Sequence, residues 1–472
     1  MLGSIASGAR GTFRDPSREI GKGGATLLWI NQRERTVSKT SIEIDAPITL
    51  DHTSFVDYAF NHWLDSLKLG IKPKTLCLLG PPGIGKSSTA YAIAERMTNY
   101  VRENPAIIFG EGVKTTADAI KLIAKDRGID LDALDDEERA KIEKENMEGL
   151  ALLLDFSSLM PEDLGGLPFR NGDFTDYCPQ RWVGKLCRKY AFGVYVQDDL
   201  PAAPQAMQVA GRQSALERRI HEHRFQNAVL VLVTGNRRQD KSSASMLPAH
   251  FRNSVTMMTI ELTLAEWKKW YGRQIGCDAV VPAFLNFKPE LLSELPTDTT
   301  DKLGAFATPR QWHSLGQQFA TAERLGSHFL TAIAAGLIGK ANALTFLAFV
   351  EIRSKLTDPE LVLDNPKNAM PDPMKELDDP SKRCAMATAL GTHAAARWTK
   401  LSGTARDNAP VQLFTALAHC SVAGDEYSAV GVQTFLDEGG DLTALARVAR
   451  KAKTDPVIGR LLDHVKKAML GV

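Results

Sequence analysis

The sequence is informative first through what it lacks. Its six cysteines form no CxxC pair, so we expect reduced, mostly buried thiols and neither a disulfide framework nor a zinc site. The formal net charge is only +1, so bulk basicity does not indicate a nucleic-acid partner. No apolar stretch is long enough to cross a membrane, and the N-terminal residues lack the continuous apolar region of a secretory signal. These absences favour a cytoplasmic globular protein.

The length of 472 residues indicates two or three domains. The Gly-, Ser- and Arg-containing residues 1–47 are typical of a mobile N-terminal arm. We expect an α/β domain over 48–260, with an acidic helical insert near 104–148 that forms a solvated surface helix rather than an interaction tail. A helical domain over 261–356 follows. Residues 357–472 comprise a Pro-, Asp- and Asn-rich linker and a helical C-terminal region.

Apolar strands alternate with helical stretches in the first half of the chain. The strand candidates are "KTLCLLG", "LALLLDFSSL", "FGVYVQDD" and "NAVLVLVTGN". The helical candidates include "HTSFVDYAFNHWLDSLKLG" and "QAMQVAGRQSALERRIHEH". This alternation predicts a parallel sheet with helices on both faces. After Glu261 the strand signal fades and helical periodicity dominates.

A glycine-rich loop stands between the first of these strands and a helix predicted to begin at Lys86. Its sequence, "GPPGIGKSS", fits the pattern G-x-x-x-x-G-K-[ST]. The glycines let successive N–H groups face phosphate oxygens, while Lys86 would bridge the β and γ phosphates and Ser87 would hold Mg²⁺. A structural glycine turn alone does not explain the Lys-Ser pair. We therefore predict a site for ATP or GTP formed by Gly80, Pro81, Pro82, Gly83, Ile84, Gly85, Lys86, Ser87 and Ser88.

Two adjacent aspartates end the strand "GVYVQDD". Such a pair is costly unless a cation or solvent is present. A phosphate-loop NTPase needs a second strand beside the first whose terminal carboxylate holds the metal, and Asp198 fits that role. Asp199 stands where a general base for the attacking water would lie, a position usually held by glutamate. Because aspartate is shorter, we predict slow hydrolysis. The alternative is a surface Asx turn before Pro201.

Taken in order, the motifs resemble the AAA+ class of ATPases and, within it, the MoxR-type branch, over roughly residues 48–355. "GPPGIGKSS" and "VQDD" resemble the Walker A and Walker B motifs, "VTGNRR" resembles sensor 1, and "FATPRQW" resembles sensor 2. "LMPEDLGGLPF" resembles a segment that MoxR-type proteins carry after their second strand. "ERRIHEHRF" resembles the short hairpin that faces the central pore in this family. The resemblance implies a P-loop (AAA+) α/β domain followed by a helical lid over 261–356.

The resemblance also implies catalytic roles outside the loop. Asn236 of sensor 1 would orient the lytic water, and Arg310 of sensor 2 would reach the γ-phosphate. In "LPAHFRNSV" the family usually has an Asn-Arg pair, but here Ser254 occupies the position of the arginine finger. Arg252 is our candidate for that role, with Arg218 or Arg219 as alternatives. The alternative interpretation is that Asn236 is a turn residue and that Arg252 is a surface arginine that packs or pairs locally.

AAA+ subunits form rings, commonly hexamers, that hydrolyse ATP at subunit interfaces, and this resemblance favours ATP over GTP. MoxR-type members resemble chaperones that remodel or activate partner proteins, often ones with a von Willebrand A domain. No DxSxS run follows a strand in this sequence, so such a partner would be a separate polypeptide. The alternatives are a nucleic-acid-directed motor or loader, suggested by the locally basic "RRIHEHR", and a nucleotide-gated scaffold with low turnover.

Overall fold

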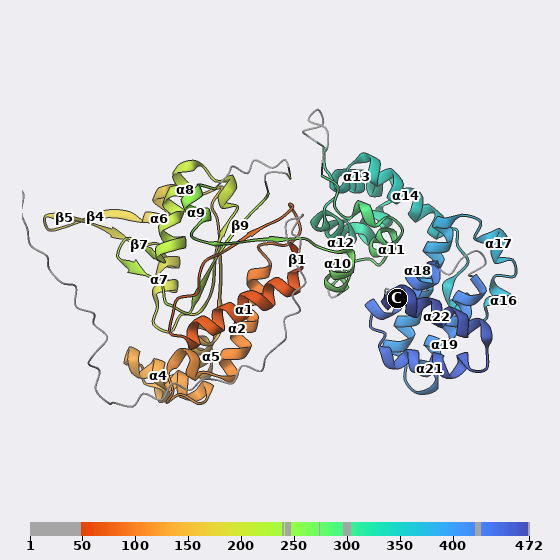
Figure 1. Ribbon diagram of the computed structural model, residues 1–472, viewed down its shortest axis with the longest axis horizontal. Coiled ribbons are helices and arrows are strands. Elements are labelled where there is room, and N and C mark those ends of the chain that lie inside the picture. Colours follow the sequence, from red (N-terminus) through yellow and green to blue (C-terminus); the bar gives the residue numbers. More distant parts are fainter. Residues whose placement is uncertain are drawn as a thin grey trace, which may run out of the picture. The chain divides into compact units, whose positions relative to one another are not determined.

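The computed structural model describes residues 49–237, 240, 247–272, 274–295, 304–420 and 426–470. Its centre is a six-stranded, fully parallel sheet with the order β1-β10-β2-β9-β6-β3 (Figure 1). The strands are β1 (Thr49–Leu50), β2 (Leu76–Leu79), β3 (Leu150–Asp155), β6 (Gly193–Asp198), β9 (Val229–Gly235) and β10 (Thr256–Ile260). The predicted fold class is confirmed as a parallel α/β sheet with helices on both faces, followed by helical regions.

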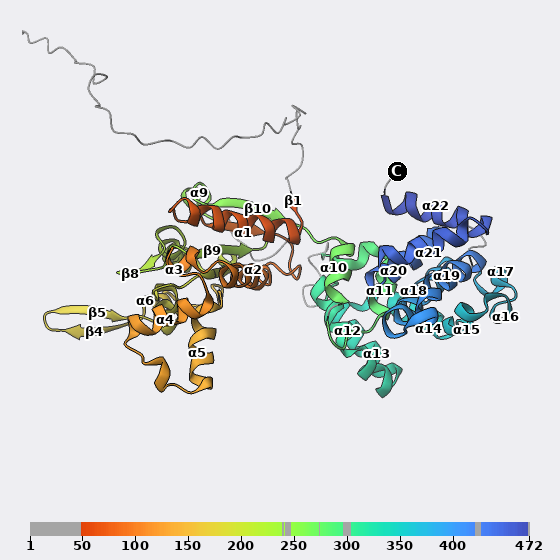
Figure 2. The same ribbon diagram turned by 90° about the horizontal axis from the view of Figure 1, so that it is seen from below.

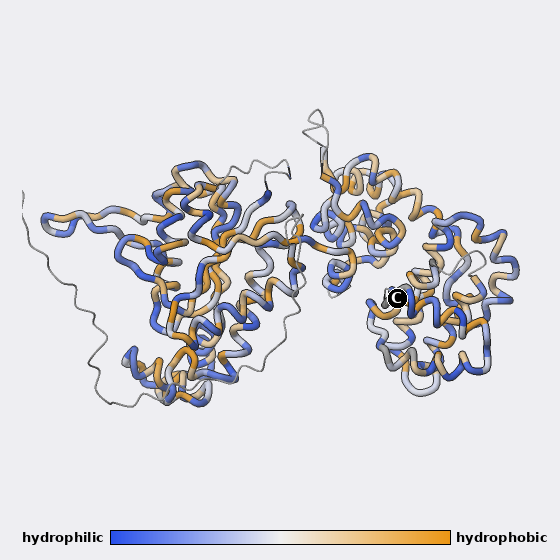
Figure 3. The backbone as a smooth tube through the Cα atoms, in the orientation of Figure 1, coloured by the Kyte–Doolittle hydropathy of each residue, from blue (hydrophilic) through white to orange (hydrophobic). Residues whose placement is uncertain are grey.

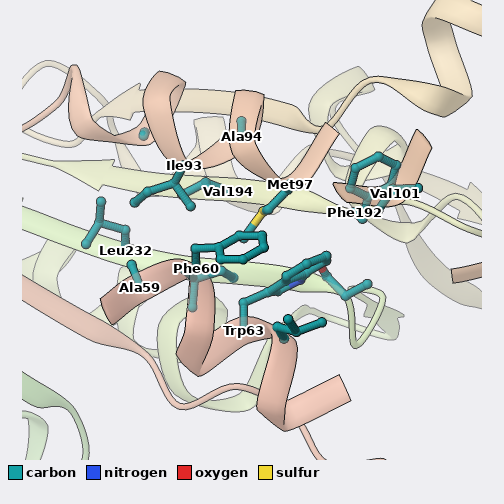
Figure 4. Close-up of a cluster of buried hydrophobic side chains, with 14 of the residues drawn as sticks. Ala59, Phe60, Trp63, Ile93, Ala94, Met97, Val101, Phe192, Val194 and Leu232 are labelled. Atoms are coloured by element: carbon teal, nitrogen blue, oxygen red, sulfur yellow. The ribbon is translucent and has the colours of Figure 1, made fainter. Parts of the chain in front are cut away.

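Each face of the sheet has its own hydrophobic core, because successive side chains of a strand point to opposite faces. Val194 and Val196 of β6 pack with α1 (His52–Lys68) and α2 (Thr89–Glu103). Tyr195, between them, packs on the opposite face. Figure 4 shows the first cluster, in which Trp63 and Phe60 of α1 meet side chains of α2 and the sheet. The buried strands therefore read as continuous apolar runs in the sequence and in the hydropathy colouring of Figure 3.

The connections carry further short elements. Between α2 and β3 lie α3 (Ala106–Phe109), α4 (Thr116–Arg127), η1 (Leu131–Ala133) and α5 (Asp136–Met147). Between β3 and β6 lie α6 (Pro161–Gly165), the antiparallel hairpin β4 (Leu167–Asn171) and β5 (Phe174–Cys178), and α7 (Arg181–Cys187). Between β6 and β10 lie η2 (Leu200–Ala202), α8 (Gln205–Arg212), the π-helix η3 (Gln213–Glu217), the hairpin β7 (Arg219–Ile220) and β8 (His223–Arg224), and α9 (Ala249–Arg252). Figures 1 and 2 both show β4–β5 extending away from the sheet.

The rest of the described chain is helical. One apolar cluster joins α10 (Leu264–Tyr271), α11 (Val280–Phe287), η5 (Pro289–Leu292), α12 (Pro309–Leu325), α13 (Ser327–Ile338) and α14 (Lys340–Ser354). A second joins α15 (Pro359–Asp364), α16 (Pro366–Ala369), α18 (Pro380–Lys400), α19 (Gly403–Cys420), α20 (Glu426–Asp437), α21 (Leu442–Ala452) and α22 (Pro456–Leu470), with α17 (Pro373–Glu376) between α16 and α18. No helix in the described ranges is both long and apolar enough to cross a membrane.

Several sequence predictions differ from the structure. Helix α2 begins at Thr89, because residues 86–88 form tight turns whose backbone bonds span three residues. The helix predicted over "QAMQVAGRQSALERRIHEH" ends in the π-helix and the β7–β8 hairpin. The predicted Pro-rich linker contains three short helices, each of which begins with a proline at the first helical position. Residues such as Val362 and Met370 bury this segment in the C-terminal cluster.

The strand order, the cysteines and the N-terminal arm were also compared with their predictions. Strands β1 and β10 were not expected, and β9 lies between β2 and β6, so the two motif-bearing strands are not neighbours. Of the six cysteines, Cys77, Cys384 and Cys420 are buried, whereas the other three are not. The predicted N-terminal arm, residues 1–47, lies outside the described residues, and the predicted domain boundaries stay predictions.

Candidate functional site

The glycine-rich loop follows β2 and leads into α2. Gly83 and Gly85 have φ values of 76° and 91°, which side chains rarely adopt. A Cβ on Gly83 would also lie 2.8 Å from Thr308 Oγ1. Gly80 has no positive φ, but a Cβ there would lie 2.8 Å from the carbonyl oxygen of Ile260. All three glycines are therefore required, two for conformation and one for close packing.

The loop presents a row of unused hydrogen-bond donors. Within the described ranges, the backbone N–H groups of residues 83–87 donate no hydrogen bond, whereas that of Ser88 returns to Gly85. Free N–H groups in native proteins are rare unless water or a ligand satisfies them. Here they precede a helix of 15 residues, whose N-terminal partial charge is positive. The row is chemically suited to phosphate oxygens.

Lys86 lies in the middle of this row and is almost fully buried. Its Nζ donates to the carbonyl oxygens of Gly80 and Pro81, at 3.0 and 2.8 Å, and to Asn236 Oδ1, at 2.7 Å. Burial lowers the pKa of Lys86 to about 8, although the nearby charge of Asp199 acts in the opposite direction. A buried ammonium held by neutral oxygens is a strong candidate for pairing with an anion.

Asp198 accepts hydrogen bonds from the loop and from the neighbouring strand β9. Ser87 Oγ lies 2.7 and 2.8 Å from its two carboxylate oxygens, and Thr234 Oγ1 also donates to it. Thr234 is fully buried in β9, the strand between β2 and β6. The strand order thus explains how the ends of three strands place these groups together. The sequence analysis did not single out Thr234, although it stands two residues before Asn236 in "VTGN".

Asp199 adopts a left-handed conformation, with φ 51°, at the start of η2. Burial raises its pKa, and the charge of Asp198 adds to this effect, while Lys86 and Arg310 oppose it. The next turn is fixed because Pro201 packs on Gly235, where a Cβ would lie 2.4 Å from the proline ring. The aspartate pair is therefore a constrained corner at the sheet edge and not an exposed turn.

Arginines predicted to act at the site differ in their placement. Arg310 is exposed near the start of α12, and its charge acts on both Lys86 and Asp199. Arg252 lies in α9 and donates to the carbonyl oxygen of Leu247, with no contact to the other site residues in the described ranges. Ser254 donates to the carbonyl oxygen of His250.

The two alternative arginines lie at the β7–β8 hairpin. Arg218 is buried and donates to the carbonyl oxygens of Pro73, Gln226, Asn227 and Val229, so it is part of the hairpin's framework. Arg219 pairs with Glu217, its partner across the turn. Arg218 is not available to a neighbouring subunit.

The oxygen ligands at this edge fit Mg²⁺. A serine hydroxyl and a carboxylate in direct contact are hard oxygen donors, and Mg²⁺ is typically bound by one or two carboxylates together with substrate phosphates and water. No group of three or more His, Cys, Asp or Glu side chains that could hold a metal ion occurs among the residues described.

Comparison with known proteins adds little to this geometry. No protein-family model matches the sequence, and no curated protein matches it. Among solved structures, the ORC2 protein of Aeropyrum pernix, solved as ADPNP-ADP complexes, is similar over 91% of this chain and 98% of its own. The sequence identity is 10% and the TM-score is 0.27. A likeness at this level does not define a family.

Proposed function

We propose that this chain is an AAA+ ATPase of the MoxR type, which binds ATP with Mg²⁺ and uses its hydrolysis to remodel or activate a partner protein. The observation that carries the proposal is the row of free N–H groups at residues 83–87, with the buried ammonium of Lys86 among them. A structural turn has no use for five consecutive free donors. The Ser87–Asp198 contact beside them supports a metal-dependent nucleotide.

In this proposal the loop binds the β and γ phosphates, and Lys86 exchanges its carbonyl and Asn236 partners for phosphate oxygens. Ser87 and Asp198 would hold Mg²⁺, which neutralises charge on the phosphates when bound. Thr234 keeps the Asp198 carboxylate in place through its hydroxyl. Release of Asn236 from Lys86 frees its amide to position the attacking water.

Asp199 is the proposed general base. Its raised pKa gives it more affinity for a proton than an ordinary aspartate has, which suits proton abstraction from water. Its short side chain still favours slow turnover. Arg310 approaches the loop from α12 and is the proposed contact to the γ-phosphate.

Hydrolysis at a subunit interface needs an arginine from a neighbouring copy. Arg252 is the proposed finger, and its single side-chain bond to a carbonyl oxygen leaves its two terminal nitrogens free within the described part of the chain. A finger supplied in trans contributes about 10³–10⁵ in rate in related NTPases. A homo-oligomeric ring, with six subunits as the first expectation, follows from this requirement.

The test is the ATPase rate per subunit measured against protein concentration, with mass determination in the presence and absence of ATP. A specific activity that rises as a ring assembles supports shared catalysis, and Arg252→Ala should then remove the rise. Arg450→Ala, a change at a C-terminal helix, is the control. A near-zero rate at all concentrations, despite tight ATP binding, would favour a nucleotide-gated scaffold instead.

A partner assay separates the remaining alternatives. Stimulation of turnover by a separate von Willebrand A domain protein supports the chaperone. Stimulation by single-stranded nucleic acid, with affinity that falls steeply with salt, supports the motor.

A further inference from the structure

Three consecutive side chains of helix α10, Glu266, Trp267 and Lys268, interact with three different parts of the chain, the first through its charge and the other two by direct contact. Successive residues of a helix point about 100° apart, so three neighbours can be directed at three separate elements.

The first interaction is electrostatic and acts on the side of the phosphate loop. Glu266 Oε2 accepts from the backbone N–H and the hydroxyl of Thr263, at 3.1 and 2.9 Å, while Oε1 is buried with no hydrogen-bond partner in the described ranges. Burial lowers the pKa of His52, and the charge of Glu266 acts in the opposite direction. His52 Nε2 in turn lies 3.6 Å from where a Cβ on Gly85 would be.

The second contact reaches the helix that carries Arg310. Trp267 Nε1 donates to the carbonyl oxygen of Pro309 at 3.1 Å. Thr308, the N-cap of the same helix, is the residue that approaches Gly83 of the loop. Helix α10 is therefore hydrogen-bonded to α12, whose N-cap approaches the loop.

The third contact is a buried ion pair with the C-terminal helices. Lys268 is 9% exposed, and its Nζ lies 2.8 Å from Asp437 Oδ2 and 2.9 Å from Asn286 Oδ1. Asp437 ends α20, and Asn286 of α11 also donates to Thr434 of α20, at 3.4 Å. One buried ammonium thus connects α10, α11 and α20.

An open cavity of about 880 Å³ adjoins this junction, lined by residues of α10, α11 and α20. Burial raises the pKa of neighbouring Glu438, and the charge of Asp437 contributes. Helix α20 itself is packed in the C-terminal cluster through Val432 and Phe435. The C-terminal helices are also attached through apolar contacts elsewhere, such as Ala385 of α18 in the cluster that contains Phe284. The ion pair is therefore a direct link between α10 and α20 but is not needed to keep the C-terminal helices attached.

We propose that α10 couples the nucleotide site to the C-terminal helices, with the Lys268–Asp437 ion pair as the link to α20. Binding of a ligand in the loop changes the surroundings of His52 and of Thr308. Helix α10 is hydrogen-bonded to α12, the helix that Thr308 caps, and the charge of Glu266 in α10 acts on His52. A shift of α10 moves Lys268, and a buried ion pair is too costly to leave broken, so α20 follows. Coupling is reciprocal, so the position of α20 also alters nucleotide affinity. This inference rests on the proposed nucleotide site.

The test is hydrogen exchange of the full chain with and without a non-hydrolysable ATP analogue and Mg²⁺. We expect the analogue to slow exchange in α2 and to change exchange in α20 by at least about fivefold, the low end of a typical coupling between sites. Lys268→Met should abolish the response in α20 while the response in α2 remains. The double variant Lys268→Met/Asp437→Leu replaces the pair with apolar side chains, folds without a buried lone charge, and should also lack the response. The exposed neighbour Lys269→Met is the control and should keep both responses.

The outcomes are distinguishable. No response in α2 would overturn the proposed nucleotide site and this inference with it. A response in α2 without one in α20 of the unaltered protein would overturn the inference alone. So would a response in α20 that persists in both Lys268 variants.

Discussion

The α/β region and the helical regions use buried charge in different ways. At the sheet edge, Lys86 and Asp198 lie at strand ends and bond to loop carbonyls and hydroxyls, which a ligand can replace. In the helical regions, Lys268 and Asp437 form an ion pair, and Lys268 also donates to Asn286 while Asp437 also accepts from Gln433. The first arrangement leaves its charges to be paired with a ligand, whereas in the second two opposite charges already lie against each other. The difference separates groups suited to chemistry from groups suited to positioning.

The largest effect is expected from Asp199→Asn, because it removes the proposed base and leaves the phosphate loop unchanged. We expect hydrolysis to slow by about 10²–10⁴ while bound ATP is retained. Rates of single turnover on preloaded protein measure this directly. Asp173→Asn, at the exposed turn of the β4–β5 hairpin, is the control. Loss of nucleotide from Asp199→Asn would mean that the roles of the two aspartates are exchanged.

Breaking the Lys268–Asp437 ion pair should lower the stability of the protein. Lys268→Met leaves Asp437 buried without its partner, and we expect the free energy of unfolding to fall by about 3 kcal/mol, because Asp437 keeps some contact with solvent. Chemical denaturation measures this, with Lys269→Met as the matched control. An unchanged free energy of unfolding together with a loss of nucleotide affinity would contradict this prediction. Lys268 would then belong with the groups suited to chemistry.

Thr234 tests whether a residue at the sheet edge acts by positioning a group suited to chemistry, here the carboxylate of Asp198. Thr234→Val keeps the shape of the side chain but removes the hydroxyl that bonds to Asp198. We expect the Mg²⁺ concentration needed for half-maximal nucleotide binding to rise about 10–100-fold, the usual cost of losing a hydrogen bond to a metal ligand. Thr234→Ser should restore most of the affinity. Equal behaviour of the Val and Ser variants would make Thr234 a packing residue.

The smallest effect is the pH dependence of nucleotide binding. Burial lowers the pKa of Lys86 to about 8 from 10.5. Phosphate favours the protonated amine, so affinity should fall above pH 8, by at most about tenfold per pH unit. The stability of the unliganded protein should rise with pH over the same window, because there the unfolded chain binds more protons than the folded one. Calorimetry in buffers of different ionisation enthalpy detects the proton uptake on binding, and Lys86→Arg should abolish it. Binding without proton uptake above pH 8 would show that the amine is not buried in solution.

The sequence predicted the parallel sheet of the α/β region well, because its strands and the glycine-rich loop are signalled by residues that are neighbours in the chain. The loop at residues 80–88, the strand ending in Asp198 and the strand before Asn236 each carry their signal locally. Thr234 was missed because its role depends on β9 lying between β2 and β6, an arrangement that no local pattern encodes. The helix predicted from Gln205 was extended too far along the chain, because helical periodicity continues into the π-helix, although the resemblance placed a short hairpin in "ERRIHEHRF", where β7 and β8 lie.

The helical regions were predicted only as helices. Lys268 and Asp437 are 169 positions apart, and each has the surroundings of an ordinary surface charge in the sequence. Their burial follows from how α10 and α20 pack, which helical periodicity does not specify. The prolines of the predicted linker were likewise typical of a loop, but three of them begin short helices. Apolar residues such as Val362 bury part of this segment in the C-terminal cluster.

Equilibrium binding of ATP with Mg²⁺ to the unaltered chain and to Lys86→Ala tests the central claim most directly. Calorimetric titration should give one site per chain for the unaltered protein. For Lys86→Ala we expect no measurable binding, and a cooperative melting transition in the absence of nucleotide is the check that the variant is folded. Undiminished binding by Lys86→Ala, or no binding by the unaltered protein, would contradict the assignment of residues 83–87 as a phosphate site.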